Sequence, residues 1–251
     1  MSGRAEVRLE SLGSGIRRLV LANPPHNALS TAMCEQAVAH LRTLLVEDEL
    51  RALIVTGAGR AFCAGADLAE LRAGLDPTTP LSELVELIRH VPVPVIAAIE
   101  GPAAGGGVEI ALACDLRVAA VSATFTASAV NVGLFAGWYH LPRLIGQAAA
   151  SEMILTGQRY AAEELARWGL VRLADPDEVH EVAARIAARI ASRPPLSVRA
   201  LTHALRASPD MDPAAAERHQ RETFARLRAS RDHAEAVAAF LDKRTPMFTG
   251  R

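Results

Sequence analysis

Apolar residues in the first half of the chain follow the pattern of a sheet covered by helices. Alternation over residues 6–9 and an apolar run over residues 16–21 predict two strands joined by a turn at residues 13–15. Two continuous apolar runs, residues 52–56 and 93–99, predict buried strands. Each run is followed by a glycine-bearing segment and then by a helical pattern. This repeat predicts right-handed crossover connections that cover a sheet.

Helical spacing fills the intervals between these strands. Ser30 is expected to cap a helix that runs to about residue 46. Helical patterns also cover residues 67–73, 82–90 and 103–113, whereas the two prolines of residues 75–80 predict a mobile loop. These elements favour an α/β fold.

The chain beyond Pro142 is predicted to be almost wholly helical and is rich in alanine. The predicted helices lie near residues 146–156, 161–167, 176–192, 196–207, 213–229 and 232–243. A helical half of this kind usually packs on the first domain or on other subunits.

Length and charge exclude several classes of protein. The 251 residues suffice for one α/β domain with a sizeable core. The formal net charge is −1, Lys243 is the only lysine, and the arginines are spread along the chain without a basic stripe. Nucleic-acid binding is therefore disfavoured.

Cysteines and apolar runs indicate a protein of a reducing compartment. The three cysteines form no CxxC pair, and their odd number argues against a disulfide framework. No run has the length of a signal peptide or a membrane helix, so we expect a cytoplasmic protein with no membrane partner. The histidines show no metal-ligand spacing, and no metal is expected.

Two glycine-bearing segments, residues 62–68 and 101–109, carry the strongest chemical signal. Each reads as a tight turn between a buried strand and a helix, and such a turn aims backbone N–H groups above the sheet. Side by side, the two turns can offer one N–H each to a single oxygen, which holds a thioester enolate or another oxyanion. Neither segment fits a dinucleotide or nucleotide phosphate loop. Close packing of a helix on a strand also selects glycine.

Glu109 lies three residues after Gly106, so both share one face of the predicted helix. Its neighbours are apolar, and desolvation there would raise the pKa of its carboxyl toward the range of a general acid and base. The alternative is a glutamate paired with a buried arginine.

With these motifs the chain resembles the crotonase superfamily, which contains the enoyl-CoA hydratases and isomerases. The matching segments are residues 27–30, 62–68, 101–109, 114–115, 132–134, 141–146, 156–157, 161–166, 169–171 and 240–244. The resemblance implies a spiral of ββα units, with residues 1–190 as the acyl-CoA-binding core and residues 191–251 as a helical trimerisation region. It also implies a homotrimer or hexamer, and no cofactor beyond the coenzyme A of the substrate.

The resemblance also implies roles for single residues. The oxyanion donors would be the backbone N–H groups of Ala66 and Gly106, and Glu109 would be the first of two catalytic glutamates. Residues expected to bind substrate are Ala64, Gly65, Asp67, Leu68, Gly105, Asn131, Trp138 and Lys243. Of these, Lys243, together with Arg244, would reach a CoA phosphate across a subunit boundary, and the alternative is a solvated charge at the end of a helix. Trp138 would fill the acyl pocket.

The chain departs from the hydratase pattern at the second glutamate. That residue should fall at Ala129, where there is no carboxylate. Tyr139 or His140, in a following loop that replaces the usual glycine-rich stretch, is a candidate substitute. The alternative is that Tyr139 fills the acyl pocket and His140 faces solvent.

Four functions therefore remain open. The first is an enoyl-CoA hydratase with Glu109 as acid and base, and the second is an isomerase that needs only one carboxylate. The third is a decarboxylase of a malonyl-type CoA, and the fourth is a non-catalytic acyl-CoA-binding protein.

Overall fold

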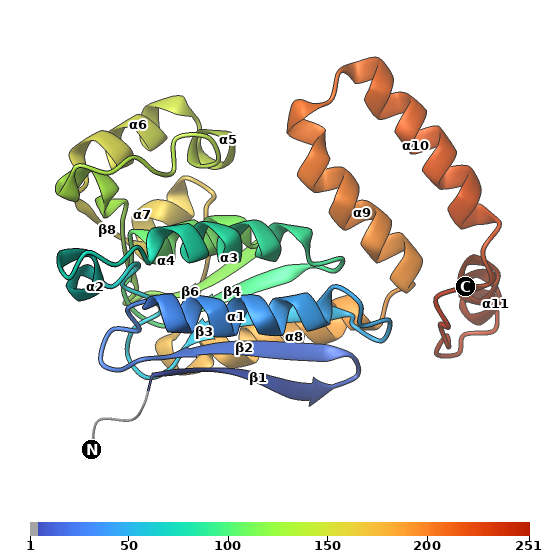
Figure 1. Ribbon diagram of the computed structural model, residues 1–251. Coiled ribbons are helices and arrows are strands. Elements are labelled where there is room, and N and C mark those ends of the chain that lie inside the picture. Colours follow the sequence, from blue (N-terminus) through green and yellow to red (C-terminus); the bar gives the residue numbers. More distant parts are fainter. Residues whose placement is uncertain (1–4) are drawn as a thin grey trace.

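The structure, a computed structural model, describes residues 5–251 and consists of a sheet-based core with a helical arm (Figure 1). The main sheet contains β1 (Glu6–Gly13), β2 (Ile16–Ala22), β3 (Ala52–Gly57), β4 (Val95–Ile99), β6 (Leu116–Ala120) and β9 (Arg172–Ala174), in that order. Only the β1–β2 pair is antiparallel, and the other neighbours are parallel. The predicted hairpin and buried strands are thus confirmed.

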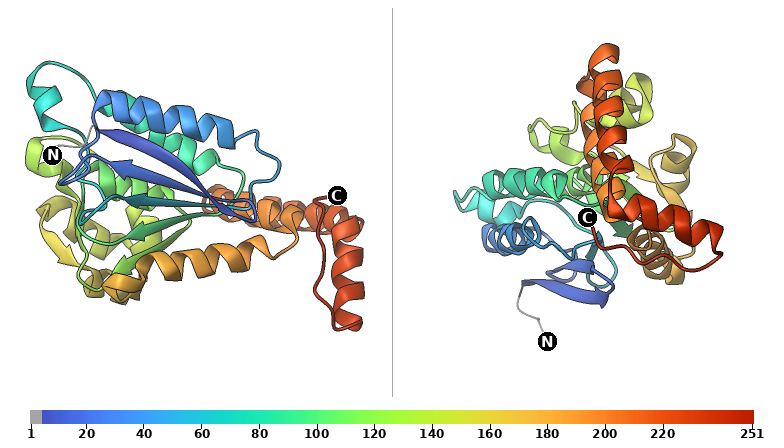
Figure 2. Two further views of the ribbon diagram at one scale, coloured as in Figure 1. Left: turned by 90° about the horizontal axis from the view of Figure 1, so that it is seen from below. Right: turned by 90° about the vertical axis from the view of Figure 1, so that its right-hand side faces the viewer.

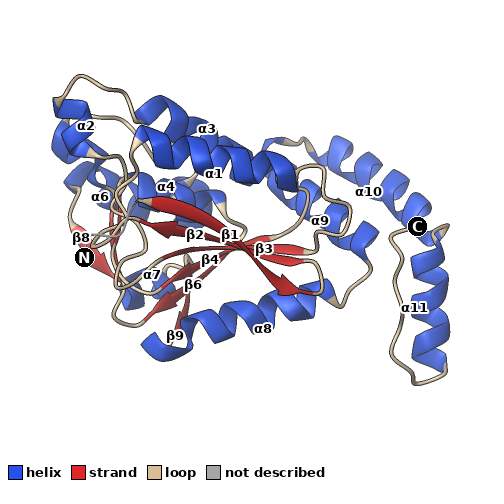
Figure 3. Cartoon of the chain, turned by 60° about the horizontal axis from the view of Figure 1, so that its bottom comes forward, coloured by secondary structure: helices blue, strands red, loops and turns tan. Residues whose placement is uncertain are grey.

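Helices cover both faces of this sheet (Figure 3). The helices of the core are α1 (Thr31–Leu44), α2 (Leu68–Arg72), α3 (Thr78–His90), α4 (Gly106–Ala113), α5 (Leu141–Ile145), α6 (Gln147–Thr156), α7 (Ala162–Arg167) and α8 (Val179–Ala191). One face packs against α8, and α1, α3 and α4 lie on the other (Figures 1 and 3). Because every residue of β3 and β4 is buried, both strands need such cover on each face.

A second sheet was not predicted, because its strands are too short to show an alternation of apolar and polar residues. It contains β5 (Ala103–Ala104), β7 (Thr124–Thr126) and β8 (Arg159–Ala161). The helix predicted over residues 103–113 therefore begins only at Gly106. A short 3-10 helix, η1 (Ser128–Val132), follows β7 and leads into the loop of residues 133–140.

The predicted loop over residues 75–80 is wrong in its second half, because α3 begins at Thr78. Asp76 accepts a hydrogen bond from the Thr78 N–H at 2.9 Å and another from the Thr79 hydroxyl at 2.6 Å, which satisfies groups of the first turn. Pro80 falls in that same turn, where a missing N–H costs nothing.

The helical arm consists of α9 (Pro195–Ala207), η3 (Ser208–Asp210), α10 (Pro213–Arg228) and α11 (Arg231–Leu241), and it extends away from the sheet (Figure 2). Arg206 anchors its base. The guanidinium donates to both carboxylate oxygens of Asp115, at 2.8 and 2.6 Å, and to the carbonyl oxygens of Arg89 and Val91. The break between α8 and α9 lies close to residue 191. The division into an acyl-CoA-binding core, residues 1–190, and a trimerisation region, residues 191–251, stays a prediction.

Within residues 5–251, no helix is both long and apolar enough to cross a membrane. The same residues contain no cluster of side chains suited to hold a metal ion. Cys34, Cys63 and Cys114 are buried free thiols. Burial raises the pKa of the Cys63 thiol to about 12, so this cysteine remains a core thiol, although it lies beside the first glycine turn.

Candidate active site

The first glycine turn follows β3 and exposes the N–H group of Ala66. Leu29 pairs with the turn through two backbone bonds: its N–H donates to the Gly65 carbonyl at 2.8 Å, and its carbonyl accepts from the Asp67 N–H at 2.9 Å. Because these bonds use the groups on either side of Ala66, the Ala66 N–H points away from Leu29. Asp67 then caps α2, where its carboxylate accepts from the Ala69 N–H at 2.8 Å.

The second glycine turn follows β4 and ends at the amino terminus of α4. Gly105 has a φ of 49°, and its carbonyl accepts from the N–H groups of Val108 and Glu109. Gly106 is the first residue of α4, so its N–H has no acceptor within the helix. In the part of the chain that the structure describes, neither this N–H nor that of Ala66 has an acceptor.

The two turns are in direct contact through their glycines. Gly65 has a φ of 85°, and a Cβ atom there would lie only 2.6 Å from the Gly106 nitrogen. The Ala104 N–H also donates to the Cys63 carbonyl at 2.9 Å, which ties the turns together. Both free amides consequently border one cavity, as predicted for an oxyanion hole.

That cavity has a volume of about 740 Å³ and lies between the glycine turns, α3 and the loop of residues 133–140. The predicted site residues that line it are Ala64, Ala66, Leu68, Gly105, Gly106, Glu109, Asn131, Trp138, Tyr139 and His140. Ala129 lines it too, so the position expected for a second glutamate faces the cavity without a carboxylate. Gly65 and Asp67 support the wall from behind.

Glu109 presents the only carboxylate among the residues that line the cavity. Its Oε1 would lie 3.4 Å from a Cβ atom at Gly137, which places it against the loop. Over residues 5–251, the carboxylate makes neither a hydrogen bond nor an ion pair with the protein. Burial raises its pKa, and the positive charge of nearby Arg89 acts in the opposite direction. Arg89 thus influences Glu109 without forming the direct pair that was the alternative.

Tyr139 faces the arm as well as the cavity. Its hydroxyl donates to Asp210 at 2.7 Å, and the Arg143 guanidinium lies over its ring, 3.6 Å from the centroid. The Asp210 carboxylate holds the phenolic proton and raises the pKa of Tyr139. The hydroxyl is therefore engaged in joining the loop to the arm.

His140 is half-buried and contacts a charged side chain that was not predicted. Its Nδ1 lies 3.2 Å from Nη1 of Arg89, in the last turn of α3. Burial, together with the charges of Arg89 and Arg143, lowers the pKa of His140 to about 4. The ring is therefore neutral at neutral pH. No sequence period pointed to Arg89, because its partner is 51 residues away.

Asn131 and Trp138 occupy the rim of the cavity. The Asn131 amide donates to the Gly157 carbonyl at 2.8 Å, so it holds η1 against the end of α6. Trp138 is 56% exposed and stacks on Phe135 with ring centroids 5.7 Å apart. An apolar rim of this kind can cover an acyl chain.

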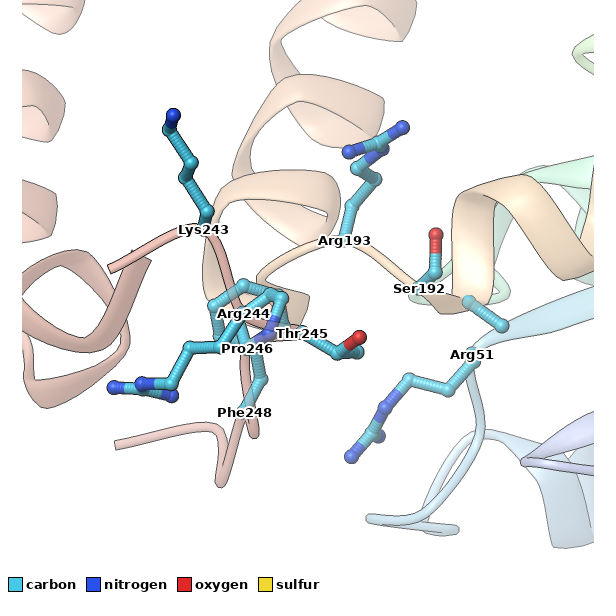
Figure 4. A pocket seen from close by; sticks show the side chains of 9 residues that line it. Arg51, Ser192, Arg193, Lys243, Arg244, Thr245, Pro246 and Phe248 are labelled. Atoms are coloured by element: carbon cyan, nitrogen blue, oxygen red, sulfur yellow. The ribbon is translucent and has the colours of Figure 1, made fainter. Parts of the chain in front are cut away.

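Lys243 lies at a different cavity, of about 600 Å³, which the end of α8 and the carboxyl-terminal tail form (Figure 4). Its neighbours there include Arg51, Arg193 and Arg244. Arg244 is engaged with Glu235 at 2.6 and 2.8 Å. Within one chain, Lys243 is thus apart from Glu109 and the glycine turns.

Comparisons with known proteins agree with this geometry. A family model described as enoyl-CoA hydratase/isomerase matches residues 11–251. The chain is 36% identical to a probable enoyl-CoA hydratase of Bacillus subtilis, over 92% of this chain and 94% of the relative. It is 32% identical to the 1,2-epoxyphenylacetyl-CoA isomerase of Escherichia coli, over 98% of this chain and 99% of the relative.

Solved structures extend the likeness to the whole fold. The crystal structure of an enoyl-CoA hydratase from Bacillus anthracis superposes with a TM-score of 0.93 at 34% identity, covering 98% of this chain and 99% of that one. The family match and the structural match both extend over nearly the full length of the chain. The chain therefore belongs to the enoyl-CoA hydratase/isomerase family, with the crotonase fold.

Proposed function

We propose that the protein hydrates 2-enoyl-CoA thioesters and that Glu109 is the acid and base of the reaction. One observation carries this proposal: the largely buried carboxylate of Glu109, one helical turn from the Gly106 amide, lines the same cavity as the Gly106 and Ala66 amides, and none of the three has a partner among the described residues. A protein that only binds acyl-CoA gains nothing from a carboxylate whose burial destabilises its charged form. The relatives named as hydratases support the same choice.

The amides of Ala66 and Gly106 bind the thioester carbonyl oxygen. Attack at Cβ pushes electron density from the double bond onto this oxygen, so both hydrogen bonds strengthen as the enolate forms. Each fixed donor of this kind contributes about 3 kcal/mol to stabilisation of the transition state. The donors are backbone groups held by packed glycines, so they need no reorganisation during the reaction.

One carboxylate suffices for the proton balance of hydration. Ionised Glu109 removes a proton from water as the water oxygen bonds to Cβ, and the protonated carboxyl then delivers that proton to Cα as the enolate collapses. The enzyme returns to its starting state, and the product gains one water. A raised pKa suits both steps, because it makes the carboxylate a stronger base and keeps its proton available for transfer.

The substrate brings its own activating group, so we propose no cofactor beyond coenzyme A itself. The protein is further proposed to act as a cytoplasmic homotrimer or hexamer. Leu205, Phe224 and Phe240 are 70%, 65% and 83% exposed on the arm, which supports its packing against another subunit. Light scattering at micromolar concentration tests the assembly, and a monomer would contradict it.

Isomerisation of 3-enoyl-CoA is the second candidate, and Ala129 is the observation that favours it. A lone carboxylate can move one proton from Cα to Cγ of the acyl chain and needs no water. The Escherichia coli relative, which is named as an isomerase of 1,2-epoxyphenylacetyl-CoA, supports isomerisation as the alternative to hydration.

The test compares crotonyl-CoA with a 3-enoyl-CoA and follows the absorbance of the conjugated enoyl thioester. Hydration predicts loss of the crotonyl signal with the wild-type protein and at least about 100-fold slower loss with Glu109→Gln. A gain of signal from the 3-enoyl substrate alone would replace the hydratase with the isomerase. Equal rates for both proteins would contradict the role of Glu109.

A further inference from the structure

Arg89 does not line the cavity, but it contacts His140 and its charge acts on Glu109. Its Nη1 lies 3.2 Å from His140 Nδ1, and its Nη2 is buried with no hydrogen-bond partner among the described residues. The Arg89 carbonyl accepts from Arg206 at 2.6 Å, which fixes the backbone at the end of α3. The backbone of Arg89 is thus anchored to Arg206, and among the described residues its guanidinium has one hydrogen-bond partner, His140.

This contact determines which nitrogen of His140 carries the proton. A guanidinium has only donors and keeps its charge throughout the working pH range. His140 Nδ1 must therefore accept, and the proton of the neutral ring lies on Nε2. Over residues 5–251, Nε2 has no protein acceptor, and His140 lines the cavity.

We propose that Arg89 is a positioning residue that holds His140 as the Nε2–H tautomer, and that this N–H donates a hydrogen bond to the attacking water opposite Glu109. The inference rests on the proposed hydration. It gives a role to His140, one of the two candidates to substitute for the carboxylate missing at Ala129.

The hydrogen-bond needs of the water explain why a donor belongs there. The water gives one proton to Glu109 and one lone pair to Cβ, so a donor to its remaining lone pair fixes its orientation. Ala129 has no polar group, the Tyr139 hydroxyl is used by Asp210, and the Asn131 amide donates to Gly157. The His140 Nε2–H lines the cavity as well, and none of the described residues accepts from it.

Protons and electrons balance without any change in His140. The water oxygen bonds to Cβ, the proton it loses passes through Glu109 to Cα, and the imidazole keeps its Nε2 proton throughout. A neutral ring is required, since an imidazolium beside Arg89 would add a second positive charge to a half-buried site.

Nitrogen-15 NMR of the histidine side chains tests the tautomer in the substrate-free protein. His140→Gln assigns the signal, and exposed His90, the neighbour of Arg89 on α3, serves as an internal reference. We expect an unprotonated Nδ1 and a protonated Nε2 in the wild type and in Arg89→Lys, and a mixture of tautomers in Arg89→Met. A protonated Nδ1 in the wild type would overturn the proposal.

Kinetics test whether the tautomer matters for hydration. Arg89→Met and His140→Phe should each lower kcat for crotonyl-CoA about tenfold with KM changed less than about twofold, and the double variant should lose no more than either. Arg89→Lys should recover most of the rate. Arg185→Met, at an exposed ion pair with Glu181, is the matched control and should keep full activity.

The outcomes separate this inference from the proposed function. Additive losses in the double variant, or an Arg89→Met protein with unchanged kcat, would overturn the link between Arg89 and His140. A wild-type protein that hydrates no enoyl-CoA would refute the proposed function, and the NMR result would still decide the tautomer. If Arg89→Met does not fold, Arg89→Lys and His140→Phe carry the same comparison.

Discussion

Replacement of Gly65 by alanine tests whether contact between the two glycine turns forms the oxyanion hole. The new Cβ would lie 2.6 Å from the Gly106 nitrogen and 2.8 Å from the Ala104 carbonyl oxygen. Both neighbours are backbone atoms, so a side-chain rotation cannot relieve the overlap. The turns must separate, which moves the Ala66 and Gly106 amides away from a common oxygen.

The expected losses follow from two separate causes. Alanine at a φ of 85° costs about 1–2 kcal/mol of unfolding free energy, and the overlap adds about 1–3 kcal/mol. Loss of one aligned donor lowers kcat about 100- to 1,000-fold. KM should change less, because the ground-state carbonyl binds the amides more weakly than the enolate does.

Gly13→Ala is the matched control, because its φ is 83° and nothing lies within 4 Å of the added Cβ. Gly13 is the last residue of β1, at the turn into β2, whereas Glu109 lies in α4. The assay is kcat and KM for crotonyl-CoA together with urea unfolding of both variants. A Gly65→Ala protein that loses stability yet keeps kcat within about twofold of Gly13→Ala would refute the oxyanion hole.

Three further results are expected. Burial raises the pKa of folded Glu109 above its ordinary value of 4.5, so the charge of this carboxylate opposes folding at neutral pH. Glu109→Gln should therefore unfold at a higher urea concentration than the wild type at neutral pH. The difference should vanish below pH 4.5, where the carboxyl is protonated in both the folded and the unfolded state. Since the charge of Arg89 lowers the pKa of Glu109, Arg89→Met should move the acid limb of the pH profile of kcat to higher pH. An unmoved limb would contradict the electrostatic effect of Arg89 on Glu109. Arg206→Met should lower the unfolding free energy by about 2 kcal/mol in urea titration, because it leaves Asp115 with only the Val95 N–H as donor and removes the Arg206 donors from three carbonyl groups; an unchanged midpoint would exclude the anchor.

The strands and the paired turns could be predicted because their signals are local. Continuous apolar runs identified β3 and β4, and the glycines after them identified the turns. Glu109 followed from a spacing of three residues within one helix. Each of these features depends on neighbours in the sequence, and the structure confirms their arrangement.

The contacts of the loop could not be predicted, because its partners are remote in sequence. Arg89 reaches His140 across 51 residues, and Asp210 reaches Tyr139 across 71 residues. No period or motif marks such pairs, and a side chain's exposure depends on the packing of several elements. The choice between Tyr139 and His140 therefore could not be made from the sequence.

Addition of deuterium oxide to crotonyl-CoA tests the central claim, that Glu109 alone transfers the proton from water to Cα. A single carboxylate on one side of the substrate must deliver the deuteron and the hydroxyl to the same face of the double bond. Proton NMR of the 3-hydroxybutyryl-CoA product reports the relative configuration at the two carbons. The account predicts the syn product with the wild type and none above background with Glu109→Gln. An anti product would contradict it.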